Sequence, residues 1–159
     1  MILYHGSNVG IDRIDLSKSN VGKDFGVGFY LTPNRDHALG QARRKVEIFS
    51  FGVPTLTAFS FDEEELQNGE LAVKVFDDYT LEWAEFVLMN RQSSNRTSLH
   101  GFDVVVGPVA DDTVGYQIRR LLGQLITMEQ FMKELKYPKE KSIQYFFGTE
   151  KSLKYLKKL

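Results

Sequence analysis

The chain of 159 residues is long enough for a hydrophobic core of its own, and we expect a single domain over residues 1–159. Hydrophobic residues make up 42% of the chain and charged residues 26%, which excludes a disordered protein. The net charge of −1 gives no general attraction to nucleic acids or to anionic membranes. Cysteine is absent, so disulfides, thiolate nucleophiles and cysteine-ligated zinc are excluded.

Metal binding and membrane association are not expected either. The three histidines, His5, His37 and His100, have no metal-ligand partner at helical or hairpin spacing. No apolar stretch is long enough to span a bilayer, and the first residues lack the basic region and long apolar core of a secretion signal. We therefore expect a cytoplasmic protein without a bound metal.

Strand-like and helix-like patterns follow one another irregularly along the chain. Strands are predicted, in chain order, over residues 2–5, 25–32, 55–61, 71–76, 102–106 and 142–147. Helices are predicted, in chain order, at 34–45, in a short acidic turn from 62, at 81–91, at 111–122, from the capping residue at 127, and in a basic segment at 149–159. Because the order is not a regular β-α-β alternation, we expect an α+β fold and not a parallel sheet.

Two segments near the start contain residues that packing alone does not require. The first is Leu-Tyr-His-Gly-Ser at 3–7, and the second is Asp-Phe-Gly-Val-Gly-Phe-Tyr-Leu-Thr at 24–32. A buried strand favours Val, Ile or Leu, and glycine weakens a strand unless a backbone or a ligand must come close. Side by side in a sheet, the two segments would bring the imidazole of His5 and the phenol of Tyr30 into one cleft, which is the strongest indication of function in the chain.

These two segments resemble the signature strands of the ADP-ribosyltransferase superfamily, in the branch of diphtheria toxin and the poly(ADP-ribose) polymerases. His5 and Tyr30 match the first two signature residues of that branch. The chain is also similar to a small bacterial subfamily of uncharacterised function within the superfamily, through residues 83–91, 102–112 and 144–147. The resemblance covers nearly the whole chain. It implies split antiparallel β-sheets with flanking helices, a fold that binds NAD as its substrate.

The resemblance further implies roles for residues of the two segments. The ring of Tyr30 would stack on the cationic nicotinamide, an attraction of roughly 0.5–2 kcal/mol, and His5 would hydrogen-bond a ribose hydroxyl. Gly6 would let its backbone approach the nicotinamide amide, where a side chain would collide, and Ser7 would add a hydroxyl contact. The residues expected to contact NAD are His5, Gly6, Ser7, Phe25, Gly28, Phe29, Tyr30, Thr32 and Arg91.

The third signature position is a glutamate on a late strand in active polymerases and many toxins, and it matches Gln144 here. Glutamine can hydrogen-bond a ribose hydroxyl but lacks the negative charge that favours a cationic transition state, an effect worth several kcal/mol in a desolvated site. Asp111, Asp112 or Glu150 could supply a carboxylate instead, although the two aspartates are more typical of helix caps and Glu150 of a first helical turn. The expected catalytic residues are therefore His5, Tyr30 and Gln144.

Hypotheses of different classes follow. The first is an NAD-dependent mono-ADP-ribosyltransferase, a bacterial toxin-like or defence effector that modifies an intracellular protein or nucleic acid, with NAD hydrolysis as a related reaction and a cognate antitoxin as a partner. The second is a module that binds NAD or ADP-ribose without turnover, because Gln144 replaces the usual glutamate. A third is an interaction domain without a ligand. Gln144→Glu would separate the first two, since a large gain in transfer would indicate a site limited by its missing charge.

Several other residues admit a structural interpretation beside the functional one. Phe25 and Phe29 fit packing or a ligand site, because alternate residues of a strand face opposite ways. Arg91 fits a helix end or a contact to a phosphate. Arg43-Arg44-Lys45 is more typical of a solvated helix face than of a phosphate contact, and the lysines at 151–158 are typical of the last turn of a helix.

Overall fold

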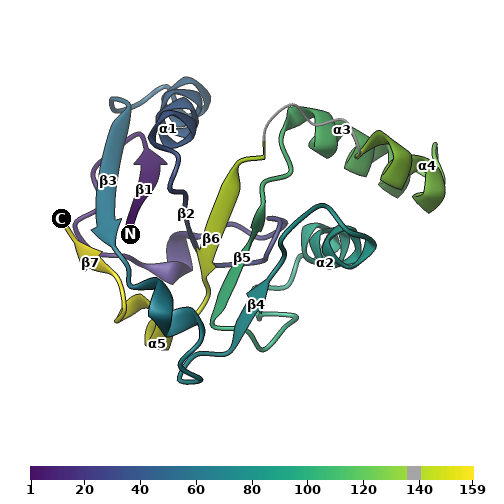
Figure 1. Ribbon diagram of the computed structural model, residues 1–159. Helices are drawn as coiled ribbons and strands as arrows, with labels where there is room; N and C mark the ends of the chain where they lie inside the picture. Colours follow the sequence, from purple (N-terminus) through teal and green to yellow (C-terminus); the bar gives the residue numbers. More distant parts are fainter. Residues whose placement is uncertain (136–140) are drawn as a thin grey trace.

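The computed structural model of the protein describes residues 1–135 and 141–159 and has an α+β fold with two mostly antiparallel sheets (Figure 1). The first sheet contains three strands, in the order β1 (Ile2–Ser7), β3 (Thr55–Ser60) and β7 (Lys157–Lys158). The second contains four strands, in the order β2 (Phe29–Leu31), β6 (Ile143–Phe147), β5 (Val104–Pro108) and β4 (Val73–Val75). Neighbouring strands are antiparallel except for β4 and β5, which are parallel.

Helices flank both sheets. Those in the described residues are α1 (Arg35–Phe49), α2 (Leu81–Gln92), α3 (Asp112–Leu122), α4 (Met128–Glu134) and α5 (Glu150–Leu153), with short 3-10 turns at Leu16–Lys18 and Glu63–Leu66. α1 begins where the sequence predicts, because the Asn34 side chain accepts a hydrogen bond from the His37 N–H at 2.9 Å and satisfies a donor of the first turn. α1 packs against β1 and β3 of the first sheet, while α3 and α4 contact each other beyond the second sheet (Figure 1).

The two sheets are joined where β1 passes the end of β2. The N–H of Tyr4 donates to the carbonyl of Thr32 at 2.8 Å, and the N–H of Thr32 donates to the carbonyl of Tyr4 at 3.0 Å. This antiparallel bridge is isolated and belongs to neither ladder. The arrangement brings the ends of β1 and β2 together while the remainder of each strand stays in its own sheet (Figure 1).

Hydrophobic side chains fill both faces of the second sheet, because successive residues of a strand point to opposite faces. The core beneath α2, α3 and α4 contains Val105, Phe146, Trp83, Ile118 and Phe131. The core between the two sheets contains Val104, Phe147, Leu3 and Phe59. β5 and β6 thus separate two cores, and the second core sets the spacing of the sheets.

The second predicted strand is shorter than the sequence indicates. Only Phe29–Leu31 pairs with β6, whereas the preceding residues turn at Gly26, whose φ is 95°. The Tyr30 hydroxyl donates to the Gly26 carbonyl at 2.7 Å and accepts from the Phe25 N–H at 3.0 Å. The prediction of a strand over 25–32 is wrong at its start, because a side-chain hydroxyl binds backbone groups that a ladder would otherwise use.

The C-terminal segment is not one long helix. α5 ends at Leu153, and the chain then returns to the first sheet, where Lys157–Lys158 pairs with β3 as strand β7. Tyr155 and Leu156 both pack against the core between the sheets. The predicted helix over 149–159 is wrong beyond its first turn because consecutive apolar side chains are drawn into that core. The lysines of β7 lie at the edge of a sheet, not in the last turn of a helix.

The remaining predicted elements are confirmed, with ends that shift by a few residues. β5 continues beyond the predicted end at residue 106 and includes Gly107 and Pro108. Asp111 caps α3 by accepting from the Val114 N–H at 2.9 Å, as expected of an aspartate at that position. Across residues 1–135 and 141–159, none of the helices combines the length and the hydropathy that crossing a membrane requires.

Candidate functional site

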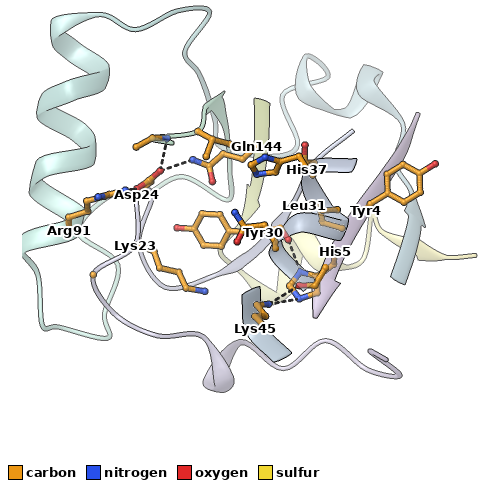
Figure 2. Close-up of a pocket in the computed structure, with 17 residues that line it drawn as sticks. Tyr4, His5, Lys23, Asp24, Tyr30, Leu31, His37, Lys45, Arg91 and Gln144 are labelled. Carbon is orange, nitrogen blue, oxygen red and sulfur yellow. Dashed lines mark hydrogen bonds and ion pairs between the residues drawn. The ribbon is translucent and has the colours of Figure 1, made fainter. Parts of the chain in front are cut away.

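A cavity of about 470 Å³ lies where the two sheets meet, which is within the size range of small-molecule sites (Figure 2). Its walls come from β1, the loop before β2, β2 itself, α1, the end of α2, the loop after β5, and the start of β6. The side chains that carry chemistry there are those of His5, Lys23, Asp24, Tyr30, His37, Lys45, Arg91 and Gln144. Segments that are distant in the sequence therefore contribute to one concave site.

His5 is fixed in the cavity wall as a neutral imidazole. Its Nδ1 lies 2.8 Å from the carbonyl oxygen of Tyr30, which can only accept, so Nδ1 carries the proton and Nε2 has a lone pair. That Nε2 lies 3.3 Å from the Nζ of Lys45, and the ring stacks on Phe29 with centroids 4.5 Å apart. Burial, together with the charge of Lys45, lowers the pKa of His5 to about 4.

Tyr30 forms an aromatic wall and does not provide a titrating hydroxyl. Its hydroxyl is bound to backbone groups of the 25–26 turn, and its ring packs edge-on against Phe146 with centroids 5.2 Å apart. Burial raises the pKa of Tyr30 well above its ordinary value, and the negative charge of Asp24 adds to this shift. The ammonium of Lys23 lies 5.0 Å from the ring centroid, within range of a cation–π contact.

Gln144 is oriented by a buried carboxylate. Its Nε2 donates to Oδ2 of Asp24 at 3.0 Å, and the same Oδ2 accepts from the Ala110 N–H at 3.2 Å. Asp24 also pairs with Arg91 of α2, whose Nε and Nη2 both lie 2.6 Å from Oδ1 (Figure 2). A carboxylate accepts only, so the amide nitrogen must face it. The amide oxygen is then the atom of the Gln144 side chain that remains able to accept a hydrogen bond.

Lys45 belongs to the cavity and not to a solvated helix face. Its Nζ donates to the Gly6 carbonyl at 2.9 Å, in addition to its contact with His5. Burial, together with the charge of Lys23, lowers the pKa of Lys45 to about 8. The neighbouring Arg43 and Arg44 are exposed, as predicted, so that interpretation is wrong only for the lysine. Successive residues of an α-helix are rotated by about 100°, so Lys45 can meet the cavity while the two arginines before it face solvent.

Comparison with known proteins identifies the family of the chain. Residues 1–158 match a protein family described as "Protein of unknown function (DUF3990)". The chain belongs to this family. No curated protein and no solved structure matches it.

The residues predicted to contact NAD divide into two groups in this DUF3990 protein. Those that line the cavity are His5, Gly6, Tyr30, Thr32, Arg91 and the predicted catalytic Gln144. Those outside the lining are Ser7, Phe25, Gly28 and Phe29. The two phenylalanines are packing residues, Phe25 fully buried in the core under the helices and Phe29 beneath the ring of His5. Ser7 is buried and donates to the side chain of Asn8 at 3.3 Å.

Gly6 and Gly28 of the two signature segments are required by packing. A Cβ added to Gly6 would lie 1.8 Å from the carbonyl oxygen of Ala38, so β1 can approach α1 only with glycine at this position. A Cβ added to Gly28 would lie 2.1 Å from the ring of Phe146. The close approach that the sequence indicates at Gly6 is real, but the group that comes close is a helix backbone.

The sequence alone did not identify Lys23, Asp24 or His37 as residues of the site. Lys23 directly precedes the second signature segment, and Asp24 is its first residue. No spacing rule links Asp24 to Arg91, which lies 67 residues away. His37 lies in the first turn of α1, half-buried, and burial lowers its pKa. Of the other carboxylates considered, Asp111 caps α3 and Glu150 begins α5, and neither is part of the described lining.

Within the described parts of the chain, no group of three or more histidine and carboxylate side chains could bind a metal ion. The carboxylate of the cavity, Asp24, is occupied by Arg91, Gln144 and a backbone N–H. The site therefore combines a neutral imidazole, an aromatic ring, an amide and two lysines.

Proposed function

We propose that this protein binds NAD in the cavity and transfers its ADP-ribose to an intracellular macromolecule, releasing nicotinamide. The observation that carries the proposal is the convergence of His5 from β1, Tyr30 from β2 and Gln144 from β6 on one cavity. His5 and Tyr30 match the first two signature residues of the ADP-ribosyltransferases, and Gln144 occupies the third position, where the signature has glutamate. The separation of β1 from β2 and β6 into two sheets agrees with the split sheet that this resemblance implies.

The chemistry asked of the protein is binding and orientation. In the proposed reaction the bond between ribose C1′ and the nicotinamide nitrogen breaks, and its electron pair leaves with nicotinamide. A nucleophilic atom of the acceptor then bonds to C1′ and loses its proton. Such a transfer needs a fixed ribose and a held leaving group more than it needs a nucleophile from the protein. That requirement fits a cavity whose His5 and Tyr30 are both immobilised by hydrogen bonds.

Each of the three residues has a defined contribution in this proposal. The ring of Tyr30 provides a stacking surface for nicotinamide. Nε2 of His5 accepts from a ribose hydroxyl, which must share or replace the contact with Lys45. The amide oxygen of Gln144, oriented by Asp24, places a partial negative charge toward the sugar. An amide dipole stabilises a developing positive charge less than a carboxylate does, so we expect slow transfer.

A second candidate function is favoured by the charges of the cavity. Lys23 and Lys45 both line it, and its described carboxylate, Asp24, is neutralised by Arg91. This excess of positive charge opposes a cationic transition state but favours a bound ligand that carries phosphates. Under this alternative, the protein binds NAD or ADP-ribose without turnover and serves as a recognition or regulatory module.

The experiment that tests NAD binding is calorimetric titration of NAD into the wild type, Tyr30→Leu and Tyr116→Leu. Tyr116 is a matched control because it is an exposed tyrosine of α3, outside the cavity lining. We expect the affinity of Tyr30→Leu to fall about tenfold, from the loss of stacking and cation–π contacts worth about 1–2 kcal/mol. Tyr116→Leu should bind like the wild type. Absence of saturable binding to the wild type would contradict both candidate functions.

A further inference from the structure

We infer that Lys23 and Lys45 together form a binding site for a phosphate group, so that the ligand of the cavity is a phosphate-bearing nucleotide held by its phosphates. The inference deepens the proposed function and rests on it for the nucleoside part of the ligand. Its observations concern residues that the resemblance does not mark, one from the loop before β2 and one from α1.

The two ammonium groups reach the cavity from separate elements. Figure 2 shows the side chain of Lys23 extending past Tyr30 toward the part of the cavity where Lys45 lies beside His5. Lys45 donates to two neutral acceptors, the Gly6 carbonyl at 2.9 Å and Nε2 of His5 at 3.3 Å. These bonds direct its ammonium to one place, but neither acceptor carries a negative charge.

Neither lysine is paired with a carboxylate in the part of the chain that the structure describes. The charged lining residues there are Lys23, Lys45, Arg91 and Asp24, three cations against one anion, which leaves two positive charges. Asp24 already pairs with Arg91 at 2.6 Å, so the two lysines account for this excess. Buried or half-buried cations without a partner are unfavourable, and an anionic ligand provides the partner.

The lowered pKa values of the two lysines agree with a site for an anion. Burial lowers the pKa of Lys23, and it lowers the pKa of Lys45 to about 8 with a further contribution from Lys23. A phosphate between the two ammonium groups would raise both pKa values again, because an opposite charge favours the charged form. Binding near pH 8 should therefore take up protons, and affinity should fall as the pH rises from about 8, the pKa of free Lys45, toward the higher pKa of the bound lysines.

Other titratable or charged groups face the same space, and they must be separated from this effect. They are Tyr4 and His5 of β1, Asp24 before β2, Tyr30 of β2, His37 of α1 and Arg91 of α2. The pKa of His5 and that of His37 are lowered, so both are neutral above pH 7, and the pKa of Tyr30 is raised. If the proton uptake on binding is lost in the lysine variants, the uptake belongs to Lys23 and Lys45 and not to these other groups.

The test is calorimetric titration with pyrophosphate, ADP and adenosine at low ionic strength and pH 8, in two buffers of different ionisation enthalpy. The proteins are the wild type, Lys23→Gln, Lys45→Gln and Lys133→Gln. Lys133 is a matched control, since it lies exposed on α4 and pairs with Glu129. We expect the wild type to bind ADP and pyrophosphate with proton uptake and to bind adenosine far more weakly. Each cavity variant should lose about tenfold or more in ADP affinity, the worth of one charge-assisted hydrogen bond.

Folding defects are separated from loss of the site by Lys23→Gln and by Lys45→Arg. The hydrogen bond of Lys23 in the described structure is through its backbone carbonyl, which accepts from the Gly26 N–H at 3.2 Å, so substitution of the side chain should leave the thermal unfolding transition nearly unchanged. Lys45→Arg retains the charge and should bind ADP more tightly than Lys45→Gln. Equal affinity for ADP in the wild type and in both glutamine variants would overturn the inference, as would equal binding of adenosine and ADP, or no binding of either anion.

The outcomes also distinguish this inference from the proposed function. Binding of ADP that depends on the lysines, without any binding of NAD, would retain the phosphate site and remove the NAD proposal. Binding of NAD that depends on Tyr30 but not on Lys23 or Lys45 would retain the proposed function and remove the phosphate site.

Discussion

Gly6 links the strand that carries His5 to helix α1. An added Cβ would lie 1.8 Å from the Ala38 carbonyl oxygen and 3.0 Å from the Ala42 N, contacts that only a backbone shift can relieve. We expect Gly6→Ala to destabilise the protein by about 3 kcal/mol, near the upper end for overpacking. Urea unfolding of the wild type and the variant measures this difference.

Gly40→Ala is the matched control for this prediction. Gly40 is exposed in the middle of α1, and nothing lies within 4 Å of its added Cβ. Alanine there should stabilise the helix by about 0.5–1 kcal/mol. If Gly6→Ala were as stable as the wild type, β1 would not pack on α1 as described, and the position of His5 relative to Lys45 would be in error.

The carboxylate of Asp24 favours an amide over a carboxylate at position 144. Its Nε2 lies 3.0 Å from Oδ2 of Asp24, so Gln144→Glu would place a second carboxylate against the first. We expect a loss of about 1–3 kcal/mol at pH 7. The new carboxyl group has a raised pKa in the folded state, so its destabilising effect should disappear as the pH falls below its unfolded value. Unfolding free energies at pH 7 and pH 4.5 test this dependence.

A gain in transfer from Gln144→Glu therefore requires a second change. The exchange Asp24→Asn with Gln144→Glu keeps one amide and one carboxylate, so it preserves the net charge while moving the charge to the signature position. We expect this double variant to release nicotinamide from NAD faster than Gln144→Glu alone. Gln117→Glu is a buried control, since Arg120 donates to Gln117 at 3.0 Å and would accommodate the new charge.

The neutral imidazole of His5 makes stability depend on pH. Its folded pKa of about 4 lies below the ordinary 6.5, so its contribution is complete above pH 6.5 and is lost as the pH falls from 6.5 to 4. The loss should be about 3 kcal/mol. His5→Asn, which keeps a donor for the Tyr30 carbonyl, should remove most of this slope in urea unfolding between pH 7 and pH 4.5. His37→Asn, at a half-buried histidine, should remove less, and an unchanged slope in His5→Asn would contradict the neutral state.

At the scale of elements, the short helix α5 connects β6 of the second sheet to β7 of the first sheet. Thr149 caps this helix through a capping box and also donates to Asp103 at 2.7 Å. Thr127 forms the same capping box on the exposed α4, with no further side-chain partner outside the box in the described structure. We expect Thr149→Ala to cost about 2 kcal/mol and Thr127→Ala about 1 kcal/mol. Thermal unfolding of the two variants checks the order, and the reverse order would contradict the account of this turn.

Local signals in the sequence predict the elements where no tertiary contact opposes them. Asn34, Asp111 and Thr127 are caps in the structure because an N-cap depends only on the residues that follow it. The local signals give a wrong prediction where a contact with a residue beyond the immediate neighbours determines the backbone conformation. The turn before β2 depends on the hydroxyl of Tyr30, and the end of α5 depends on the core between the sheets.

At the scale of the whole molecule, the cavity exists because two sheets meet at a single bridge between Tyr4 and Thr32. The sequence marked His5, Tyr30 and Gln144 through their resemblance to a known signature, and the structure brings them to the same cavity. It did not mark Asp24 or Lys23, and for Lys45 it favoured a solvated helix face over a phosphate contact, because the places of these residues follow from contacts between distant segments. Lys45 in particular has the sequence context of a surface residue, and only the packing of α1 on β1 turns it inward.

The charges of the whole site affect the rate expected for the proposed transfer of ADP-ribose. An excess of two lysines favours the phosphates of a nucleotide, whereas a neutral amide at position 144 gives little support to a cationic transition state. For the proposed transferase, these charges predict tight binding of the nucleotide and slow turnover.

The most direct test of the central claim is the release of nicotinamide from NAD, measured over hours with water and with a cell extract as sources of acceptor. The wild type should release nicotinamide above the buffer rate, and His5→Ala and Tyr30→Ala should lose this activity while Tyr116→Ala retains it. Release that persists in both cavity variants would place the chemistry elsewhere. No release, combined with no calorimetric binding of NAD, would contradict the proposed function.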